Sequence, residues 1–311
     1  MTNTLTQWIN RHLVGVSLVV IVLVFSLAAD NFMSTATVAA ILNQLPALTL
    51  VTVGMTFVLI CGGIDLSVGS VLALSSAVIG VSLAAGMPLP VALLLGIVAG
   101  GLIGLVNGLF GSYLKLPVFI VTLGMLEIAR GLAYLVTDSQ TIFIGSSIQG
   151  LVQPLPYLQL TPAFGIALLV VAAGHFLLNA TVFGRHVVAT GTNTEAARIA
   201  GINTQRTLML VLCLSGALAG LGGVMNSAYL GATDPNAGIG LELSAIAAAV
   251  IGGTSLMGGR GSVISAFIGV LIIAVLQSGL AQMGVSEPFK RVITGAVIVL
   301  AVVLDRWRSV D

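Results

Sequence analysis

The chain has 311 residues, of which 58% are hydrophobic and only 7% are charged, with a formal net charge of +1. Soluble domains carry about 25% charged residues, so this composition excludes an ordinary soluble protein and indicates an integral membrane protein. The near-neutral charge also gives no sign of a nucleic-acid partner. Unbroken apolar runs of about twenty residues favour spanning helices over a barrel, whose strands would alternate apolar and polar residues. The 38 glycines suit membrane helices, because small residues let backbones approach closely.

Apolar runs bounded by polar residues, proline or glycine predict ten membrane spans. They are expected near 13–29, 40–61, 66–86, 91–112, 117–136, 162–181, 208–228, 242–256, 263–283 and 289–304. The first run follows Arg11 and is interpreted as a retained span, because it is long for a signal peptide and many spans follow it. The expected fold is a single all-α transmembrane domain, residues 1–311.

The Lys and Arg residues predict the orientation of these spans. With a cytoplasmic N-terminus, eight of the eleven basic residues fall in cytoplasmic segments: Arg11, Lys115, Arg185, Arg198, Arg206, Arg260, Arg306 and Arg308. Lys290 and Arg291 would be external, and Arg130 lies inside a span. The positive-inside rule therefore predicts that both termini are cytoplasmic.

The stretch GGIDLSVGS, residues 62–70, places Asp65 between two apolar runs. Asp65 is expected either to be the N-cap of the third span, worth roughly 1 kcal/mol, or to be a gating or coupling carboxylate, since ionisable groups at membrane depth are usually functional. The two roles are compatible, because a cap on a discontinuous helix is also a hinge. Gly63 and Gly69 would give this hinge its backbone freedom.

Glu127 and Arg130 are three positions apart in the fifth expected span, so they are predicted to share a helix face and to pair. A partner lowers the cost of an arginine within a membrane. A structural pair is the favoured interpretation, and gating or substrate contact is the alternative.

Two long loops separate the expected spans. Residues 137–161 are external and nearly free of charge in the predicted topology, and they are expected to cap an external mouth. Residues 182–207 form the one substantial internal loop.

Within the internal loop, residues 191–202 predict a short amphipathic helix outside the membrane. Asn193 or Thr194 is the expected N-cap, Glu195 lies in the first turn, and Gly201 is the expected stop.

The two halves of the chain contain a repeat. GIDLS at 63–67 has a counterpart in GLELS at 240–244, and each leads into an apolar run that ends in VIG. In the predicted topology the copies have opposite orientations, which indicates an inverted repeat of spans 2–5 and 7–10. Glu242 would then have the role of Asp65 at the outer face.

A glycine-rich segment, residues 251–262, follows the second copy of the repeat. Its sequence IGGTSLMGGRGS favours tight helix packing or a cytoplasmic hinge at Gly252, Gly253 and Gly259.

Polar side chains within or near the spans could line an aqueous path or bond between helices. They are Asn43, Gln44, Asn107, Asn179, Asn226 and Gln277. The predicted translocation path is assigned to Asn43, Gln44, Asn107 and Asn226.

No motif predicts catalysis or a cofactor in this chain. A nucleotide-binding P-loop needs a lysine after a glycine, and neither Lys115 nor Lys290 follows one. No second histidine or carboxylate lies at the sequence spacing of metal ligands from His175, so no metal site is expected. Cys61 and Cys213 lie in apolar stretches and are interpreted as core residues.

Four segments together resemble one family, the membrane permeases of bacterial sugar-importing ABC transporters of the ribose type. These are TVGMTFVLICGGIDLSVGS (52–70), LPVFIVTLGMLEIARG (116–131), GTNTEAARIAGI (191–202) and LELSAIAAAVIGGTSLMGGRGS (241–262). They occur in the family's order and cover nearly the whole chain. One departure is Glu127, where related permeases often have an apolar residue.

The resemblance implies a permease in the bacterial inner membrane that carries ribose or a related pentose or hexose. It implies a homodimer, or a heterodimer with a second permease, a cytoplasmic ATPase that binds ATP and Mg²⁺, and a periplasmic sugar-binding protein. Residues 191–202 look like the coupling helix that contacts the ATPase. Asn193, Glu195, Arg198 and Gly201 are the contact residues that the motif implies.

The expected mechanism is alternating access, in which a partner ATPase moves the coupling helix and spans pivot at the glycines of 62–70 and 252–261. The alternative is an ion-coupled secondary transporter, in which Asp65, Glu127 or Glu242 would bind the coupling ion.

Overall fold

The computed structural model describes residues 4–156 and 159–308, and helices make up nearly all of it. The helices are α1 (Thr4–Ala28), α2 (Thr35–Gln44), α3 (Pro46–Ile60), α4 (Val68–Ala84), α5 (Leu89–Ser112), α6 (Val118–Val136), the 3-10 helix η1 (Gly145–Leu151), α7 (Pro162–Ala180), α8 (Val182–Thr192), α9 (Thr194–Ile199), α10 (Thr204–Leu230), α11 (Leu241–Ile251), α12 (Val263–Gln282) and α13 (Glu287–Arg308). Strands β1 (Ile142–Phe143) and β2 (Ala232–Thr233) form one short antiparallel pair. The predicted all-helical architecture is confirmed.

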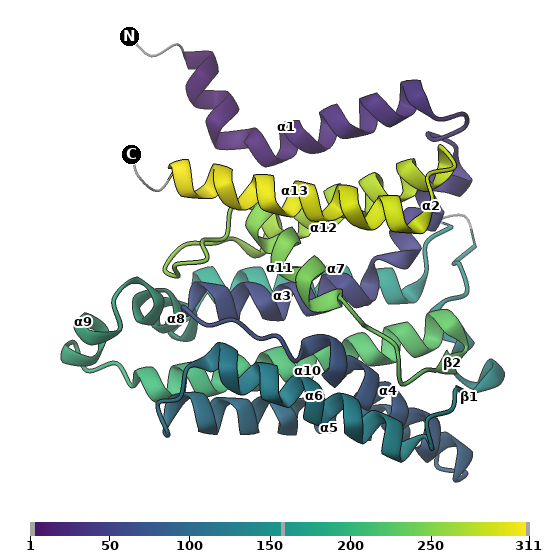
Figure 1. Ribbon diagram of the computed structural model, residues 1–311, viewed down its shortest axis with the longest axis horizontal. Coiled ribbons are helices and arrows are strands. Elements are labelled where there is room, and N and C mark those ends of the chain that lie inside the picture. Colours follow the sequence, from purple (N-terminus) through teal and green to yellow (C-terminus); the bar gives the residue numbers. More distant parts are fainter. Residues whose placement is uncertain (1–3, 157–158, 309–311) are drawn as a thin grey trace.

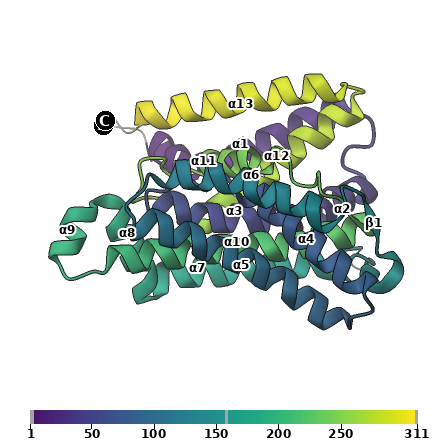
Figure 2. The ribbon, with the colours of Figure 1, turned by 60° about the horizontal axis from the view of Figure 1, so that its bottom comes forward.

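The long helices run roughly along one direction of the molecule (Figure 1). The short helix α9 projects at one end, and β1, β2 and α2 lie at the opposite end. Helices α1 and α13 cover one side of the bundle, and α5 and α6 cover the other (Figure 1). In the view of Figure 2, α13 is still outermost and α9 still projects beyond the other helices. The start of α1 and the end of α13 lie at the α9 end.

Local sequence chemistry sets where the helices begin. The side chains of Thr161, Asn203 and Ser262 accept hydrogen bonds from backbone N–H groups in the first turns of α7, α10 and α12. Each cap satisfies a donor that has no partner within its helix. Pro162 begins α7, where the missing N–H of proline costs no hydrogen bond.

Helix α10 runs through the centre of the bundle and packs most extensively against α5 through glycines. A Cβ added at Gly216 would overlap the carbonyl oxygen of Gly100 and lie 2.8 Å from the Gly104 Cα. A Cβ at Gly220 would lie 3.0 Å from the Ile97 Cα. Lipid gives helices no hydrophobic reason to associate, so this close backbone contact supplies the packing energy.

Five helices are long and apolar enough to cross a membrane, counted over the described residues: α5, α6, α7, α10 and α12. Helices α2 and α3 form a sixth candidate if they are counted as one span bent by 47° at the Leu45–Pro46 break. The predicted spans 91–112, 117–136, 162–181, 208–228 and 263–283 therefore match helices closely. The predicted span 40–61 corresponds to the bent pair.

Two predicted spans are shorter in the structure. The predicted span 242–256 is wrong in length, because α11 has 11 residues, about 17 Å of helix against about 30 Å of hydrocarbon. It ends because Gly253 adopts a left-handed conformation with φ +85°. The predicted span 66–86 begins later, at Val68, so α4 has 17 residues.

Both predicted long loops differ in detail from the expectation. The 137–161 segment contains β1 and η1, and its residues 157–158 lie outside the described residues. The 182–207 segment is mostly helical, because α8 occupies Val182–Thr192 and is capped by the Thr181 side chain.

The α5–α10 contact predicts a large effect of side-chain volume at Gly216. We expect Gly216→Val to lower the free energy of unfolding by roughly 1–3 kcal/mol, because the added atoms push two backbones apart. Thermal unfolding in detergent measures this loss. Gly165→Val is the matched control, since Gly165 is an exposed helical glycine with open space around it. Equal stability of the two variants would contradict the prediction.

Candidate functional site

A cavity of about 830 Å³ opens between the α2–α3 bend, the end of α10, the start of α11, the end of α12 and the start of α13. Its size suits a small-molecule ligand. Helix α10 begins beside α9 and extends for 27 residues, about 40 Å. Because Met225, Asn226 and Tyr229 at its far end line the cavity, the cavity lies about one membrane thickness from α9.

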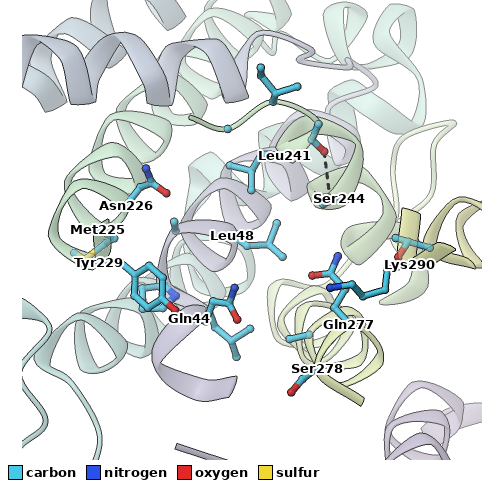
Figure 3. A pocket seen from close by; sticks show the side chains of 18 of the residues that line it. Gln44, Leu48, Met225, Asn226, Tyr229, Leu241, Ser244, Gln277, Ser278 and Lys290 are labelled. Carbon is cyan, nitrogen blue, oxygen red and sulfur yellow. Dashed lines mark hydrogen bonds between the residues drawn. The ribbon is translucent and has the colours of Figure 1, made fainter. Parts of the chain in front are cut away.

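Polar side chains face the cavity from two sides (Figure 3). Gln44, Asn226 and Tyr229 lie on one side, and Gln277 and Lys290 lie on the other (Figure 3). The amide and hydroxyl groups among these donate and accept hydrogen bonds with a neutral polyhydroxylated ligand, and the Lys290 ammonium can donate to its oxygens.

The structure brings together some of the predicted path residues and separates others. Gln44 and Asn226, two of the residues assigned to the path, line the cavity. Asn43 also borders it, but the Asn43 amide donates to the Gln159 carbonyl oxygen at 3.0 Å and accepts from the Thr161 N–H at 2.9 Å. Asn107 is fully buried and does not line the cavity, so its assignment to the path stays a prediction.

Several cavity residues were missed as site residues from the sequence. Tyr229, Ser244 and Lys290 line the cavity, and Gln277 was noted only as one of several polar residues. Tyr229 and Lys290 lie near helix ends, where such residues are normally interfacial anchors. Their sequence positions therefore carry no separate signal for a cavity.

The cavity is closed towards the α9 end by packed apolar side chains. Leu48 and Leu241 line the cavity and pack against a buried cluster that includes Val51, Met55 and Leu72. Packed side chains therefore separate the cavity from the interior of the bundle on this side.

The starts of α4 and α11, the two copies of the sequence repeat, meet beside this cavity. A Cβ at Gly69 would overlap the Gly238 carbonyl oxygen and a carboxylate oxygen of Glu242, and one at Gly238 would lie 2.6 Å from the Gly69 carbonyl oxygen. The other Glu242 oxygen accepts the Gly240 N–H at 3.2 Å. Gly238 has φ +72° and Gly240 has φ +81°, conformations that favour glycine. The predicted hinge residues Gly69 and Glu242 are thus in contact.

Asp65 is buried in the α3–α4 break and holds three hydrogen bonds. One carboxylate oxygen accepts the Ser67 N–H at 3.0 Å and the Ser67 hydroxyl at 2.6 Å, and the other accepts the Ser215 hydroxyl of α10 at 2.9 Å. The Asn107 amide donates to the Ser67 hydroxyl at 2.9 Å. Asp65 thus joins the break to α10, and through Ser67 to α5.

The N-cap interpretation of Asp65 is wrong in position. Ser67 occupies the N-cap of α4, and its own side chain makes no capping bond. Asp65 instead accepts the N–H of that N-cap residue from two positions earlier in the chain. The sequence could not reveal this, because only two residues separate the two arrangements.

The predicted pair of Glu127 and Arg130 is not formed. The Arg130 Nη1 donates to the carbonyl oxygens of Pro235 at 2.5 Å and Ala237 at 2.8 Å. The Glu127 side chain is exposed. Two free carbonyls of the α10–α11 loop therefore compete successfully for the guanidinium.

A glycine junction lies at the α9 end of the bundle, where the end of α3, the end of α8 and the segment after α11 meet. A Cβ at Gly191 would overlap the Ile60 carbonyl oxygen and lie 2.8 Å from the Gly259 nitrogen. The Gly259 N–H donates to the same Ile60 oxygen at 2.8 Å. Gly259 has φ +75°, so this predicted hinge residue is in a conformation that favours glycine.

The other predicted hinge glycines have different surroundings. Gly63 lies against Val58 and Val118, and its neighbour Gly62 has the positive φ of +85°. Gly252 lies so close to α12 that a Cβ would be 2.6 Å from the Ala266 Cα, whereas Gly253 has open space around it.

Helix α9 has the predicted start and stop, although it is shorter than the expected 191–202. The Asn193 side chain accepts the Ala196 N–H at 2.9 Å, and Gly201 follows the helix with φ +86°. Arg198 donates to Glu195 at 2.6 Å, and both side chains are 65% exposed. Ile199 is 80% exposed, so α9 presents charged and apolar groups to its surroundings.

No group of three or more His, Cys, Asp or Glu side chains gathers at one point in the described part of the chain.

The sequence matches the family described as branched-chain amino acid transport system / permease component over residues 37–302. It is 38% identical to the ribose import permease protein RbsC of Bacillus subtilis (strain 168), covering 94% of this chain and 91% of that protein. It is 36% identical to the D-allose transport system permease protein AlsC of Escherichia coli (strain K12), covering 94% and 90%. The fructose import permease protein FrcC of Rhizobium meliloti is 35% identical, with 92% and 84% covered. No solved structure matches the chain.

The Asp65 bonds predict an energetic coupling between Asp65 and Ser215. We expect Asp65→Ala to lower the free energy of unfolding by roughly 1–3 kcal/mol, because it leaves buried hydroxyl groups without an acceptor. Asp65→Asn keeps an acceptor oxygen and should cost less. In a double-mutant cycle with Ser215→Ala, thermal unfolding should reveal a coupling of about 1 kcal/mol.

Ser76→Ala provides the control for this cycle. The Ser76 hydroxyl is buried on α4 but donates to the Gly223 carbonyl oxygen, outside the Asp65 bonds. Its effect should add to that of Asp65→Ala. Additive effects of Asp65→Ala and Ser215→Ala would contradict the proposed link.

Proposed function

From the premise that the chain belongs to this permease family, as the non-catalytic permease component of a carbohydrate ABC importer, we propose that it carries a monosaccharide across the bacterial inner membrane. Ribose, or a related pentose or hexose, is the proposed class of substrate, in line with what the names of the relatives say they transport. The observation that carries this proposal is the cavity, whose amide and hydroxyl side chains suit a neutral sugar.

Ten crossings are proposed for the single domain 1–311, with the α9 end in the cytoplasm. They are α1, the bent pair α2–α3, α4, α5, α6, α7, α10, α11 together with the non-helical segments before and after it, α12 and α13. The basic residues Lys115, Arg198 and Arg260 in the connections at the α9 end support this orientation. The cavity then opens towards the periplasm, where a sugar would arrive.

An inverted repeat is proposed to relate the segment α2–α6 to the segment α10–α13. In each segment a helix crosses the bundle, the chain breaks, and a short helix (α4 or α11) starts at the break. The contact of Gly69 with Gly238 supports this relation, because it places the two breaks against each other. Half-helices that start within the membrane are typical of transporter sites.

The cytoplasmic ATPase of the importer hydrolyses ATP and carries the nucleotide and its Mg²⁺, while a binding protein supplies the sugar. We place the ATPase contact on α9 and its flanks, at Asn193, Glu195, Arg198 and Gly201. Two permease subunits, most simply two copies of this chain, would surround the path.

Alternating access is proposed to follow from the glycine junction. Gly191 precedes α9 by three residues and contacts both the Ile60 carbonyl and Gly259. A displacement of α9 by the ATPase would therefore move the end of α3 and the segment after α11 together. Gly63, Asp65, Gly69, Glu242, Gly252, Gly253 and Gly259 are the proposed hinge and gate residues.

The first test is sugar uptake into proteoliposomes that contain this chain, with and without the partner ATPase and binding protein. We expect uptake of D-ribose, D-allose or D-fructose only when both partners and ATP are present. An imposed ion gradient without the partners provides the control. Uptake driven by the gradient alone would contradict the proposal and favour an ion-coupled transporter.

Charge reversal at α9 tests the coupling assignment. Exposed ion pairs add little to stability, so Arg198→Glu should leave the unfolding temperature nearly unchanged. We expect it to reduce ATP-driven uptake about tenfold, the loss for one hydrogen bond to a charged group at the ATPase contact.

Two further variants sharpen this test. Arg206→Glu is the matched control, since Arg206 is also exposed near α9 but lies outside the α9 helix. The swap Glu195→Arg with Arg198→Glu keeps the internal pair and reverses both charges towards the partner. Full uptake by the swapped variant would mean that the pair acts only within this chain.

A further inference from the structure

We propose that Glu127 lines the water-filled solute path and that its carboxylate accepts hydrogen bonds from the hydroxyl groups of the passing sugar, an inference that rests on the proposed function. Glu127 is the tenth of the 19 residues of α6, so it lies near the middle of a membrane-spanning helix. Its side chain is exposed and forms no hydrogen bond or ion pair within the described part of the chain.

Lipid is an unsuitable environment for this carboxylate. A charged carboxylate at the centre of a membrane costs several kcal/mol when it faces lipid, so such groups face a protein interior or a water-filled space. Because the bundle does not cover Glu127, the space beside it must be polar.

Helix α6 has two sides that differ in polarity between Glu127 and Leu135. Ile128, Leu132 and Leu135 form an apolar side that suits lipid. Glu127, Arg130 and Tyr134 follow each other at spacings of three and four residues, so they share the other side. Arg130 and Tyr134 are half-buried on this side, and the exposed apolar residues Ile120 and Leu123 continue it towards the α9 end, so its polar part is confined to Glu127–Tyr134.

The polar side of α6 faces the α10–α11 loop, which also forms part of the cavity wall. Arg130 donates to the carbonyl oxygens of Pro235 and Ala237, and the Tyr134 hydroxyl donates to Asn236 at 2.7 Å. Residues 238–241 of the same segment line the cavity. The polar side of α6 and the cavity thus both border the α10–α11 loop.

The depth of Glu127 suits a group that the solute meets after it leaves the outer mouth. Tyr134 lies near the end of α6 that is distant from α9, and Glu127 is seven residues, about 10 Å, deeper. Glu127, Asp234 and Glu242 all interact electrostatically with Arg130. The guanidinium is held by backbone carbonyls, which leaves the oxygens of Glu127 free to accept hydrogen bonds from a polyol.

Cysteine labelling in the assembled transporter tests this placement. Cys61→Ala and Cys213→Ala first remove both native thiols. Glu127→Cys is then treated with a charged, membrane-impermeant methanethiosulfonate, with Ile128→Cys as the control because it is exposed at the same depth on the apolar side. We expect Glu127→Cys to react at least about tenfold faster, since thiolates form in water and not in lipid. We also expect the transported sugar, D-ribose, D-allose or D-fructose, to slow this reaction.

Uptake by Glu127→Gln provides a second measurement in the chain with native cysteines. We expect the uptake rate to fall about tenfold, the loss for one hydrogen bond to a charged group. The ATPase activity stimulated by the binding protein should persist. Normal uptake by Glu127→Gln, or labelling at position 127 that is no faster than at 128 or is unaffected by sugar, would overturn the inference. Failure of the wild-type chain to take up sugar would instead overturn the proposed function, and the labelling comparison would still decide whether Glu127 faces water.

Discussion

Backbone groups at membrane depth that are shielded from water need other hydrogen-bond partners, and at the α3–α4 and α10–α11 breaks side chains supply them. Helix α6 contributes such side chains to both breaks. At the α3–α4 break, the Thr122 hydroxyl donates to the Ile64 carbonyl oxygen at 3.0 Å and accepts the Leu66 N–H at 3.1 Å. At the α10–α11 break, Arg130 donates to two carbonyls of the loop. One continuous helix therefore stabilises both discontinuous ones, and eight residues of α6 set the spacing between the breaks.

Glycine determines how closely these parts can approach. Gly69 and Gly238 bring the starts of α4 and α11 into backbone contact, and Gly100, Gly104 and Gly216 do the same for α5 and α10. The first contact lies where the chain is broken, whereas the second joins two uninterrupted helices. Glycine therefore makes a close helix–helix contact between α5 and α10. At the start of α11 it also permits a left-handed turn, as the φ of +72° at Gly238 indicates.

Long apolar runs made much of the helical architecture predictable. Helices α5, α6, α7, α10 and α12 follow directly from runs of about twenty apolar residues, and Asn193 was predictable as a cap because capping is local. The partners of Asp65 and Arg130 were not predictable, since Ser215 is 150 residues from Asp65 and Pro235 is 105 residues from Arg130. Glu127 and Arg130 have the spacing of a helical pair. The Arg130 guanidinium instead binds free carbonyl oxygens of a distant loop, which have no other donor in a membrane. Tyr229 and Lys290 line the cavity only because the ends of distant helices come together in the fold. The residues next to them in the sequence do not indicate that arrangement.

The short length of α11 gives its two ends linked roles. Its first turn lines the cavity and contacts Gly69, while the segment after its last turn contacts Gly191 through Gly259. Eleven residues of helix span about 17 Å and bend little over that length. A shift at the glycine junction that passes the hinge residues Gly252 and Gly253 would therefore reach the cavity as a tilt or translation of the whole helix. Arg130 restrains the loop that leads into α11, so any such movement either carries the loop with it or exchanges the carbonyl partners of the guanidinium. An intermediate position would leave buried carbonyls without donors, which favours two discrete arrangements over a continuous one.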